Sequence, residues 1–207
     1  MLSKFKEYLH RKEEILLSKR IVEILKPFAN KDMNLLEVGC SDGSYAIERC
    51  QGLGIIEIYG TDVGKKRLEQ ANERGIKAYF CDLEKDSLPF DNEYFDIIIC
   101  NQVLEHLKKI HLLMDECHRV LKNNGLLLVS VPNLAAIHNR LLLFIGKQPT
   151  TLQVLSEHVR GFAPDAFKSY LTLNNLFNLI KYSCSGFYPF PPQYQLYYRD
   201  CFQSWQF

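Results

Sequence analysis

A glycine-bracketed turn directly after a short apolar strand is the part of this chain best suited to chemistry. Residues 35–43 read Leu-Leu-Glu-Val-Gly-Cys-Ser-Asp-Gly, so Gly39 and Gly43 enclose small polar residues. Glycine adopts backbone angles that are closed to other residues and lets a ligand approach the main chain closely. A helix expected from Ser44 would add its unpaired N–H groups. This pattern predicts a turn that cradles a nucleotide.

Polar residues also end the other strands that the sequence predicts. Asp62, Asp82 and the pair Asn101-Gln102 each follow or close an apolar stretch. In a doubly wound sheet, ligands bind beyond the carboxyl ends of the strands, so these residues are placed to meet one. Asp62 is suited to accept hydrogen bonds from ribose hydroxyls, and Asp82 from an adenine amino group. Taken singly, the glycines could form a structural turn, and Asp62 could cap a helix.

The elements that must position these residues alternate along the chain. Strands are expected at 34–38, 55–61, 77–81, 95–101 and 126–131, and helices at 44–50, 65–74 and 110–122. The run Ile97-Ile98-Ile99 is continuously apolar, as expected when helices cover both faces of a parallel sheet. The sequence therefore predicts an α/β fold with a doubly wound, mostly parallel sheet.

Helical segments precede and follow this core. From Leu2 to Lys26, the residues Phe5, Leu9, Leu16, Ile21, Ile24 and Leu25 recur at helical spacing. Pro27 closes this pattern, which predicts one or two amphipathic helices. The basic face of this segment consists of Lys4, Lys6, Arg11 and Lys12, and we expect it to be solvated. After Pro132, helical stretches at 133–145 and 164–171 form an insertion long enough to cover a substrate as a lid. We expect one domain over 1–207, made of a helical segment (1–30), a ligand-binding core (31–132) and the lid with the last part of the sheet (133–207).

Composition limits the function classes. The chain has 207 residues, of which 47% are hydrophobic and 24% charged, and a formal net charge of +1, so neither nucleic acid nor an anionic membrane is an expected partner. The seven cysteines contain no Cys-x-x-Cys pair. We therefore expect reduced thiols in a cytoplasmic protein, and no metal site. No apolar run approaches the roughly 18 residues of a membrane span.

The chain resembles class I S-adenosyl-L-methionine (SAM)-dependent methyltransferases, specifically the small UbiE/UbiG-like and MetW-like kind. The resemblance covers residues 35–133. It rests on an ordered set of motifs: Glu37-Val38-Gly39-Cys40-Ser41-Asp42-Gly43, Asp62, Asp82-Leu83, Leu88-Pro89-Phe90, Tyr94-Phe95-Asp96, Gln102-Val103-Leu104-Glu105-His106-Leu107 and Arg119-Val120-Leu121-Lys122-Asn123-Asn124-Gly125.

The resemblance implies a Rossmann-like methyltransferase fold and a set of cofactor-binding residues. Glu37 with the backbone of Gly39, Cys40 and Gly43 would hold the amino acid part of SAM. Asp62 and Val63 would hold the ribose, Asp82 and Leu83 the adenine, and Asn101, Gln102 and Val103 would pass near the methyl sulfonium. Ser41 departs from the family, which usually has a glycine there. Because Gly39 and Gly43 remain, we expect SAM binding to be kept.

Methyl transfer from a sulfonium needs mainly positioning and desolvation, so a base is optional. If the acceptor is a hydroxyl, His106 and His158 are the candidate catalytic residues, because imidazole titrates near neutrality. His106 could instead cap or pack at the start of a helix, and the two interpretations of His158 are balanced. Arg140 and Arg160 could bind a carboxylate or phosphate of the acceptor.

The function predicted is a SAM-dependent methyltransferase that acts on a small molecule or on a glycan- or lipid-linked intermediate, with oxygen as the expected acceptor atom. A SAM-binding regulatory or partner protein without turnover is the alternative. A nicotinamide-dependent oxidoreductase is disfavoured, since the turn lacks the Gly-x-Gly-x-x-Gly spacing.

The end of the chain predicts an incomplete sheet. Residues 180–186 and 193–198 are short strand candidates separated by Pro189, Pro191 and Pro192. We expect either a frayed edge or an edge that a second subunit completes as a homodimer, because unpaired strand edges invite pairing. The aromatic tail at 197–207 would then need covering, and deleting 187–207 should lower solubility.

Overall fold

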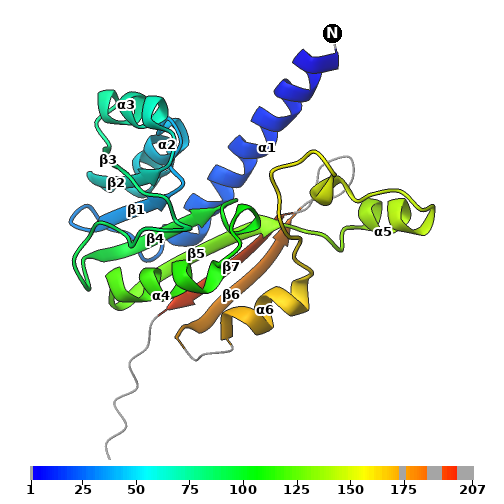
Figure 1. The fold of residues 1–207 in the computed structure, drawn as a ribbon. Helices are drawn as coiled ribbons and strands as arrows, with labels where there is room; N and C mark the ends of the chain where they lie inside the picture. Colours follow the sequence, from blue (N-terminus) through cyan, green and yellow to red (C-terminus); the bar gives the residue numbers. More distant parts are fainter. Residues whose placement is uncertain (1, 173–175, 186–192, 200–207) are drawn as a thin grey trace, which may run out of the picture. The chain divides into compact units, whose positions relative to one another are not determined.

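A computed structural model describes residues 2–172, 176–185 and 193–199 of the protein (Figure 1). The chain divides after Phe80 into two units, each with its own strands and helices. The sequence prediction of one methyltransferase domain over 1–207 stays a prediction.

The first unit is a parallel three-stranded array with helices. Its elements are α1 (Leu2–Leu25), β1 (Asn34–Val38), α2 (Ser44–Leu53), β2 (Glu57–Asp62), α3 (Lys65–Glu73) and β3 (Lys77–Phe80). Strand β2 lies between β1 and β3, and both pairings are parallel. The carboxyl ends of β1 and β2 therefore lie side by side, which brings the glycine turn next to Asp62.

Helix α1 is one continuous helix that ends two residues before Pro27, as the sequence predicts. Its buried face carries Leu17, Ile21, Ile24 and Leu25, whereas Leu16 is 67% exposed, so the expectation that Leu16 belongs to the apolar face is wrong. The side chains of Phe5 and Leu9, and of Lys4, Lys6, Arg11 and Lys12, lie outside the described residues.

The second unit combines parallel and antiparallel strands. Its elements are β4 (Phe95–Asn101), the 3-10 helix η1 (Leu104–His106), α4 (Ile110–Val120), β5 (Leu121–Pro132), α5 (Ile137–Phe144), the 3-10 helix η2 (Thr150–Leu152), α6 (Pro164–Thr172), β6 (Asn178–Ser185) and β7 (Gln193–Arg199). Strand β4 pairs with β5 in parallel, and β7 lies antiparallel between β5 and β6. Figure 1 shows α6 beside the antiparallel strands and α5 set apart from them.

The buried core of the second unit is the apolar run of β4. Ile97, Ile98, Ile99 and Cys100 are all fully buried, as expected of a strand covered on both faces. Strand β5 begins at Leu121, earlier than the predicted residue 126. Its pairing with β4 shifts register between Phe95 and Ile97, so this extension follows an irregularity that apolar periodicity does not reveal.

The frayed edge expected at the end of the chain is wrong. Strands β6 and β7 are eight and seven residues long and pair from Ser185 and Gln193 to Asn178 and Arg199. The segment with the three prolines, 186–192, lies outside the described residues, as does 200–207. Completion of the sheet by a second subunit, and the packing of the tail, stay predictions.

The insertion after β5 begins with a capped turn before its helix. Asn133 accepts a hydrogen bond from the Ala135 N–H at 2.8 Å, which delays the helix from the predicted residue 133 to Ile137. Asn139 is fully buried; its amide donates to the Asn133 carbonyl at 3.0 Å and its side-chain oxygen accepts from the Thr150 N–H at 2.9 Å. These bonds fix the start of the insertion.

Candidate functional site

The glycine turn adopts the left-handed backbone that its sequence predicts. Gly39 and Gly43 have φ angles of 72° and 79°. A Cβ at Gly43 would also overlap the side chain of Ile76, so packing requires a glycine there whether or not a ligand binds. Ser41, in the position where the family usually has a glycine, is left-handed as well, at φ 51°. An L-residue in this region carries a steric cost of about 1–2 kcal/mol.

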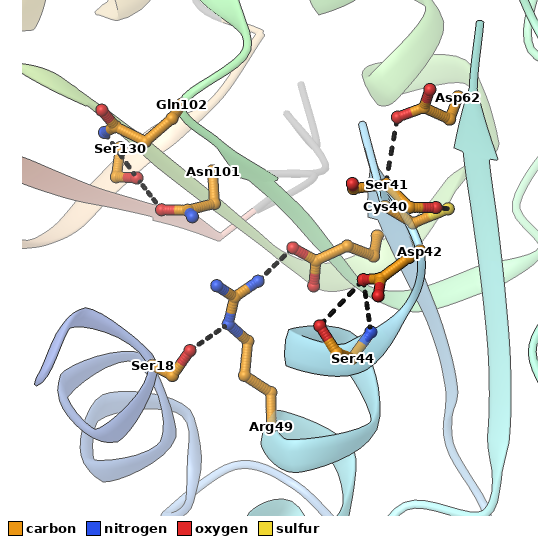
Figure 2. Close-up of polar contacts among 11 residues, drawn as sticks. Ser18, Cys40, Ser41, Asp42, Ser44, Arg49, Asp62, Asn101, Gln102 and Ser130 are labelled. Carbon is orange, nitrogen blue, oxygen red and sulfur yellow. Dashed lines mark hydrogen bonds and ion pairs between the residues drawn. The ribbon is translucent and has the colours of Figure 1, made fainter. Parts of the chain in front are cut away.

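Asp62 ties this turn to the end of β2. One carboxylate oxygen accepts a hydrogen bond from the Ser41 N–H at 3.0 Å (Figure 2). The other accepts from the Gly64 N–H at 2.7 Å and from Arg67 at 3.2 Å. Only 9% of the Asp62 side chain is exposed. The local capping role is therefore real, and a ribose would share this carboxylate. The neighbouring Val63 is 59% exposed.

The first N–H group of α2 is already paired, in contrast to the prediction that it is available to a ligand. Asp42 accepts hydrogen bonds from the Ser44 N–H at 3.2 Å and the Ser44 hydroxyl at 2.8 Å (Figure 2). It also forms an ion pair with Arg74 at 3.1 Å. Partial burial would raise the pKa of Asp42, but these donors outweigh it and hold the pKa below its usual value. The carboxylate stays charged at the helix N-terminus.

A buried ion pair lies beneath the glycine turn. The Arg49 guanidinium donates to one oxygen of Glu37 and, through Nε, to the Ser18 hydroxyl at 3.1 Å (Figure 2). The two charged side chains are only 2% and 4% exposed. Burial raises the pKa of Glu37, and Arg49 offsets part of this rise. The sequence did not predict Arg49 as a partner.

The second carboxylate oxygen of Glu37, Oε2, indicates whether Glu37 and the glycine turn could hold SAM. Oε2 is buried and accepts no hydrogen bond from any described residue. Buried acceptors of this kind are normally paired, so the site suits an additional donor. The ammonium group in the amino acid part of SAM is such a donor, and the left-handed turn next to Glu37 leaves the main chain open to close approach. The residues therefore fit the cofactor.

Cys40 lies in the turn but is packed as an apolar group. It is 6% exposed, and a Cβ at Gly60 would come within 2.6 Å of its sulfur. Burial, followed by the charges of Asp62 and Glu37, raises the pKa of the thiol to about 12. The thiol is thus protonated at neutral pH, and Cys40 contributes its backbone rather than a nucleophile.

In the second unit, the predicted residues after β4 form a hydrogen-bonded group with β5. The Ser130 hydroxyl donates to the Asn101 side chain (Figure 2). The backbone N–H of Gln102 donates to the Ser130 carbonyl at 3.0 Å. Gln102 has a left-handed φ of 55° and its side-chain amide lies 3.4 Å from the Ser130 hydroxyl. Val103 is buried. Ser130 was not predicted from the sequence as a site residue. A serine inside an otherwise apolar strand is the sequence feature that could have indicated it.

Asp82 holds a turn of its own chain. One oxygen accepts from the Glu84 N–H at 3.1 Å, and the other is paired with Lys85 at 2.6 Å. The hydrogen bond from Lys85, followed by that from Glu84, lowers the pKa of Asp82. Leu83, beside it, is half-buried. Both predicted adenine contacts therefore lie in a turn that its own hydrogen bonds fix.

The two candidate catalytic histidines come together. The rings of His106, in η1, and His158, in the insertion, are 4.8 Å apart and nearly perpendicular. Burial, followed by the proximity of His158, lowers the pKa of His106, which favours the neutral form of this ring. Glu105, which was not predicted, is 1% exposed beside them.

The two predicted arginines differ in their placement. Arg160 donates to the Lys108 carbonyl at 2.6 Å and so joins the histidine region. Arg140 is exposed on α5 and donates to the Ala135 carbonyl at 2.8 Å. Of the two, Arg160 is thus the one that the structure brings to the segment after β4.

The methyltransferase-like motif that begins at Arg119 stabilises a loop. Arg119 donates to the carbonyls of Leu88 and Phe90, at 2.9 and 2.8 Å, and forms an ion pair with Glu116 at 2.7 Å. The Leu88 N–H in turn donates to Glu116 at 2.7 Å. Arg119 and Glu116 therefore fix the loop before β4 onto α4.

Comparison with known proteins agrees with this geometry. Residues 36–129 match the family described as a methyltransferase domain. The ubiquinone biosynthesis O-methyltransferase of Glaesserella parasuis serovar 5 is 32% identical over 137 residues, which are 62% of this chain and 56% of that protein. The chain spans about half the length of the curated relatives it matches.

Solved structures share the fold over most of the chain. Magnesium protoporphyrin IX methyltransferase from Synechocystis PCC 6803, solved with bound SAH, has a TM-score of 0.70 at 16% identity, covering 91% of this chain and 84% of that one. A SAM-dependent methyltransferase from Archaeoglobus fulgidus has a TM-score of 0.67 at 17% identity, covering 96% and 99%. At these identities the likeness concerns the fold. The predicted Rossmann-like α/β fold and the resemblance to class I SAM-dependent methyltransferases are confirmed. Within the described ranges, no helix is both long and apolar enough to cross a bilayer.

Proposed function

We propose that this protein is a SAM-dependent methyltransferase. The observation that carries the proposal is the glycine turn at Gly39–Gly43, hydrogen-bonded to Asp62 inside the matched methyltransferase region. SAM would supply an activated methyl group on its sulfonium sulfur. Glu37 and the turn would hold its amino acid part and Asp62 its ribose, while the family resemblance assigns the adenine to Asp82 and Leu83.

The acceptor in this proposal is a small molecule or a glycan- or lipid-linked intermediate, methylated at oxygen. The O-methyltransferase name of the relative from Glaesserella parasuis supports oxygen. Large apolar side chains exposed on α5 and after it, including Phe144 at 88% and Leu155 at 98%, favour an acceptor with an apolar part. Neutral His106 and adjacent His158 would hold or remove the hydroxyl proton.

The proposal also places the protein in the cytoplasm. The five cysteines whose side chains are described, Cys40, Cys50, Cys81, Cys100 and Cys117, all have free thiols and are buried, which fits a reducing compartment.

Calorimetry with S-adenosylhomocysteine (SAH), the product form of the cofactor, tests the proposal. We expect stoichiometric binding, and a stabilisation by mass action of about 2.7 kcal/mol at a concentration 100 times the Kd. NAD at the same concentration is the control and should produce neither heat nor a thermal shift. Absence of SAH binding at millimolar concentration would overturn the proposal, whereas SAH binding without turnover on any hydroxylated acceptor would favour the SAM-binding regulatory alternative.

A further inference from the structure

Three potential metal ligands converge where the insertion meets η1. One ligand atom from each of Glu105, His106 and His158 lies within 4.8 Å of the other two. Glu105 and His106 are adjacent in η1, and His158 comes from the distant insertion. A carboxylate and two imidazoles are a common ligand set for divalent transition metals, with His₂Glu the set used by several zinc enzymes.

Each of the two histidines has one ring nitrogen beside a backbone carbonyl, which leaves its other nitrogen for a ligand. Nδ1 of His158 lies 2.8 Å from the Thr151 carbonyl, and Nδ1 of His106 lies 3.3 Å from the Glu157 carbonyl. A carbonyl oxygen only accepts, so each Nδ1 carries the proton and each Nε2 carries the lone pair. Backbone carbonyls that orient ligating histidines in this manner are a regular feature of metal sites.

The two segments are joined without help from a metal. The Val159 N–H donates to the Glu105 carbonyl at 2.9 Å, and Arg160 donates to the Lys108 carbonyl at 2.6 Å. The ligands are therefore positioned by backbone contacts on either side of the cluster.

We propose that Glu105, His106 and His158 bind one divalent transition-metal ion, of the Mn²⁺, Co²⁺ or Zn²⁺ type. Three protein ligands leave coordination positions open. Resting on the proposed function, the ion would bind the acceptor hydroxyl there and lower its pKa, as bound metals do for water. In this arrangement His158 serves as a ligand in place of the base role given to it above, and the hydroxyl proton passes to water. A metal site without cysteine departs from the expectation from the sequence that no metal binds.

Titration of the chelator-treated full chain with CoCl₂ and MnCl₂ tests the site. We expect one ion per chain, with the weak visible absorption of Co²⁺ bound by nitrogen and oxygen. His158→Ala and Glu105→Gln should each weaken binding at least about tenfold. His111→Ala, an exposed histidine on α4, is the matched control and should bind as the wild type does. Far-UV circular dichroism identifies any variant that fails to fold, and the unmodified protein alone already decides whether an ion binds.

Specific results would overturn the inference. These are no binding at millimolar metal, intense thiolate-to-Co²⁺ absorption that shows cysteine ligation, or equal affinities for the His158 and His111 variants. SAH binding, measured on the same samples, separates this inference from the proposed function. Normal SAH binding without metal binding refutes the metal site alone, while metal binding without SAH binding refutes the cofactor proposal and leaves the site standing.

Discussion

Removing the Arg49 charge should strongly destabilise the protein. In Arg49→Met, the carboxylate of Glu37 stays at its buried position and the Ser18 hydroxyl loses its donor. Because the two charged side chains are only 2% and 4% exposed, solvent screens little of the lost interaction. Breaking a buried pair from one side costs about 3–5 kcal/mol. We expect a decrease of this size in the free energy of unfolding at pH 7.

Urea unfolding followed by circular dichroism measures this change. Two further variants serve as comparisons. Arg20→Met removes an exposed pair, Arg20–Glu23, whose side chains are 44% and 64% exposed, so its effect should stay within about 1 kcal/mol. The double variant Glu37→Leu/Arg49→Met removes both buried charges. Apolar replacement of a whole buried pair is often neutral or stabilising, so the double variant should be more stable than Arg49→Met.

The pH dependence of this stability loss is a second, independent test of the same account. Burial raises the pKa of Glu37 in the folded protein above its ordinary value of 4.5. The stability that this group contributes is therefore fully present below about pH 4.5 and is lost as the pH rises through the raised pKa. Without Arg49 the rise is larger, so the stability difference from the wild type should be smaller at pH 5 than at pH 7. A loss below 1 kcal/mol, or a double variant no better than the single one, would refute this account.

Four other substitutions separate backbone strain, cofactor binding, loop fixation and turnover. Ser41→Gly should raise the free energy of unfolding by about 0.5–1 kcal/mol in urea, since relief of the left-handed strain exceeds the added chain entropy; a destabilised variant would contradict this. Asp62→Ala should weaken SAH binding at least tenfold in calorimetry, because a charge-assisted hydrogen bond contributes about 1.5–3 kcal/mol; an unchanged Kd would make Asp62 only a cap. Arg119→Ala should lower the free energy of unfolding by at least about 2 kcal/mol, because two carbonyls lose their donor. A smaller decrease would show that water replaces the guanidinium. His158→Ala should reduce turnover while SAH binding stays normal, and equal loss of both would indicate misfolding.

Local sequence patterns were sufficient for part of the fold. The bounds of β1 and β4 were predicted without error, because each strand is mostly apolar and ends at a turn or at a polar residue. The left-handed angles of Gly39 and Gly43 followed from residue type in the same way. The extent to which β6 and β7 pair was underestimated from the sequence. Strand pairing is a tertiary property, and the intervening prolines mark only the connection between the strands.

The missed site residues share a physical cause. Arg49 lies on α2 among polar residues, where a charged side chain normally faces water. Its burial depends on α1 lying across it with Ser18, a contact that spans 31 residues. Glu105 and His158 likewise come from segments joined only by the folded insertion, so their spacing in the sequence carries no metal-binding pattern.

Backbone strain in the two units adds an argument about function. Ser41 and Gln102 are non-glycine residues with left-handed φ angles of 51° and 55°, and each follows the carboxyl end of a parallel strand. In each case the strained residue donates its own N–H, Ser41 to Asp62 at 3.0 Å and Gln102 to Ser130 at 3.0 Å. Strain that the surrounding structure holds in this way is concentrated at functional sites.

Asn124 shows why strain alone is a weak criterion. It is also left-handed, at φ 63°, but it lies at the other end of β5, before the regular pairing with β4 resumes at Leu126. Asparagine tolerates this conformation in turns, so Asn124 needs no functional reason. Serine and glutamine lack that tolerance. Ser41 and Gln102 both lie in turns at the carboxyl ends of strands, where an α/β sheet binds its ligand. Position, residue type and the retained hydrogen bond together, rather than the φ angle alone, support the proposal, for each unit taken by itself, that the turns at Ser41 and Gln102 contact a ligand.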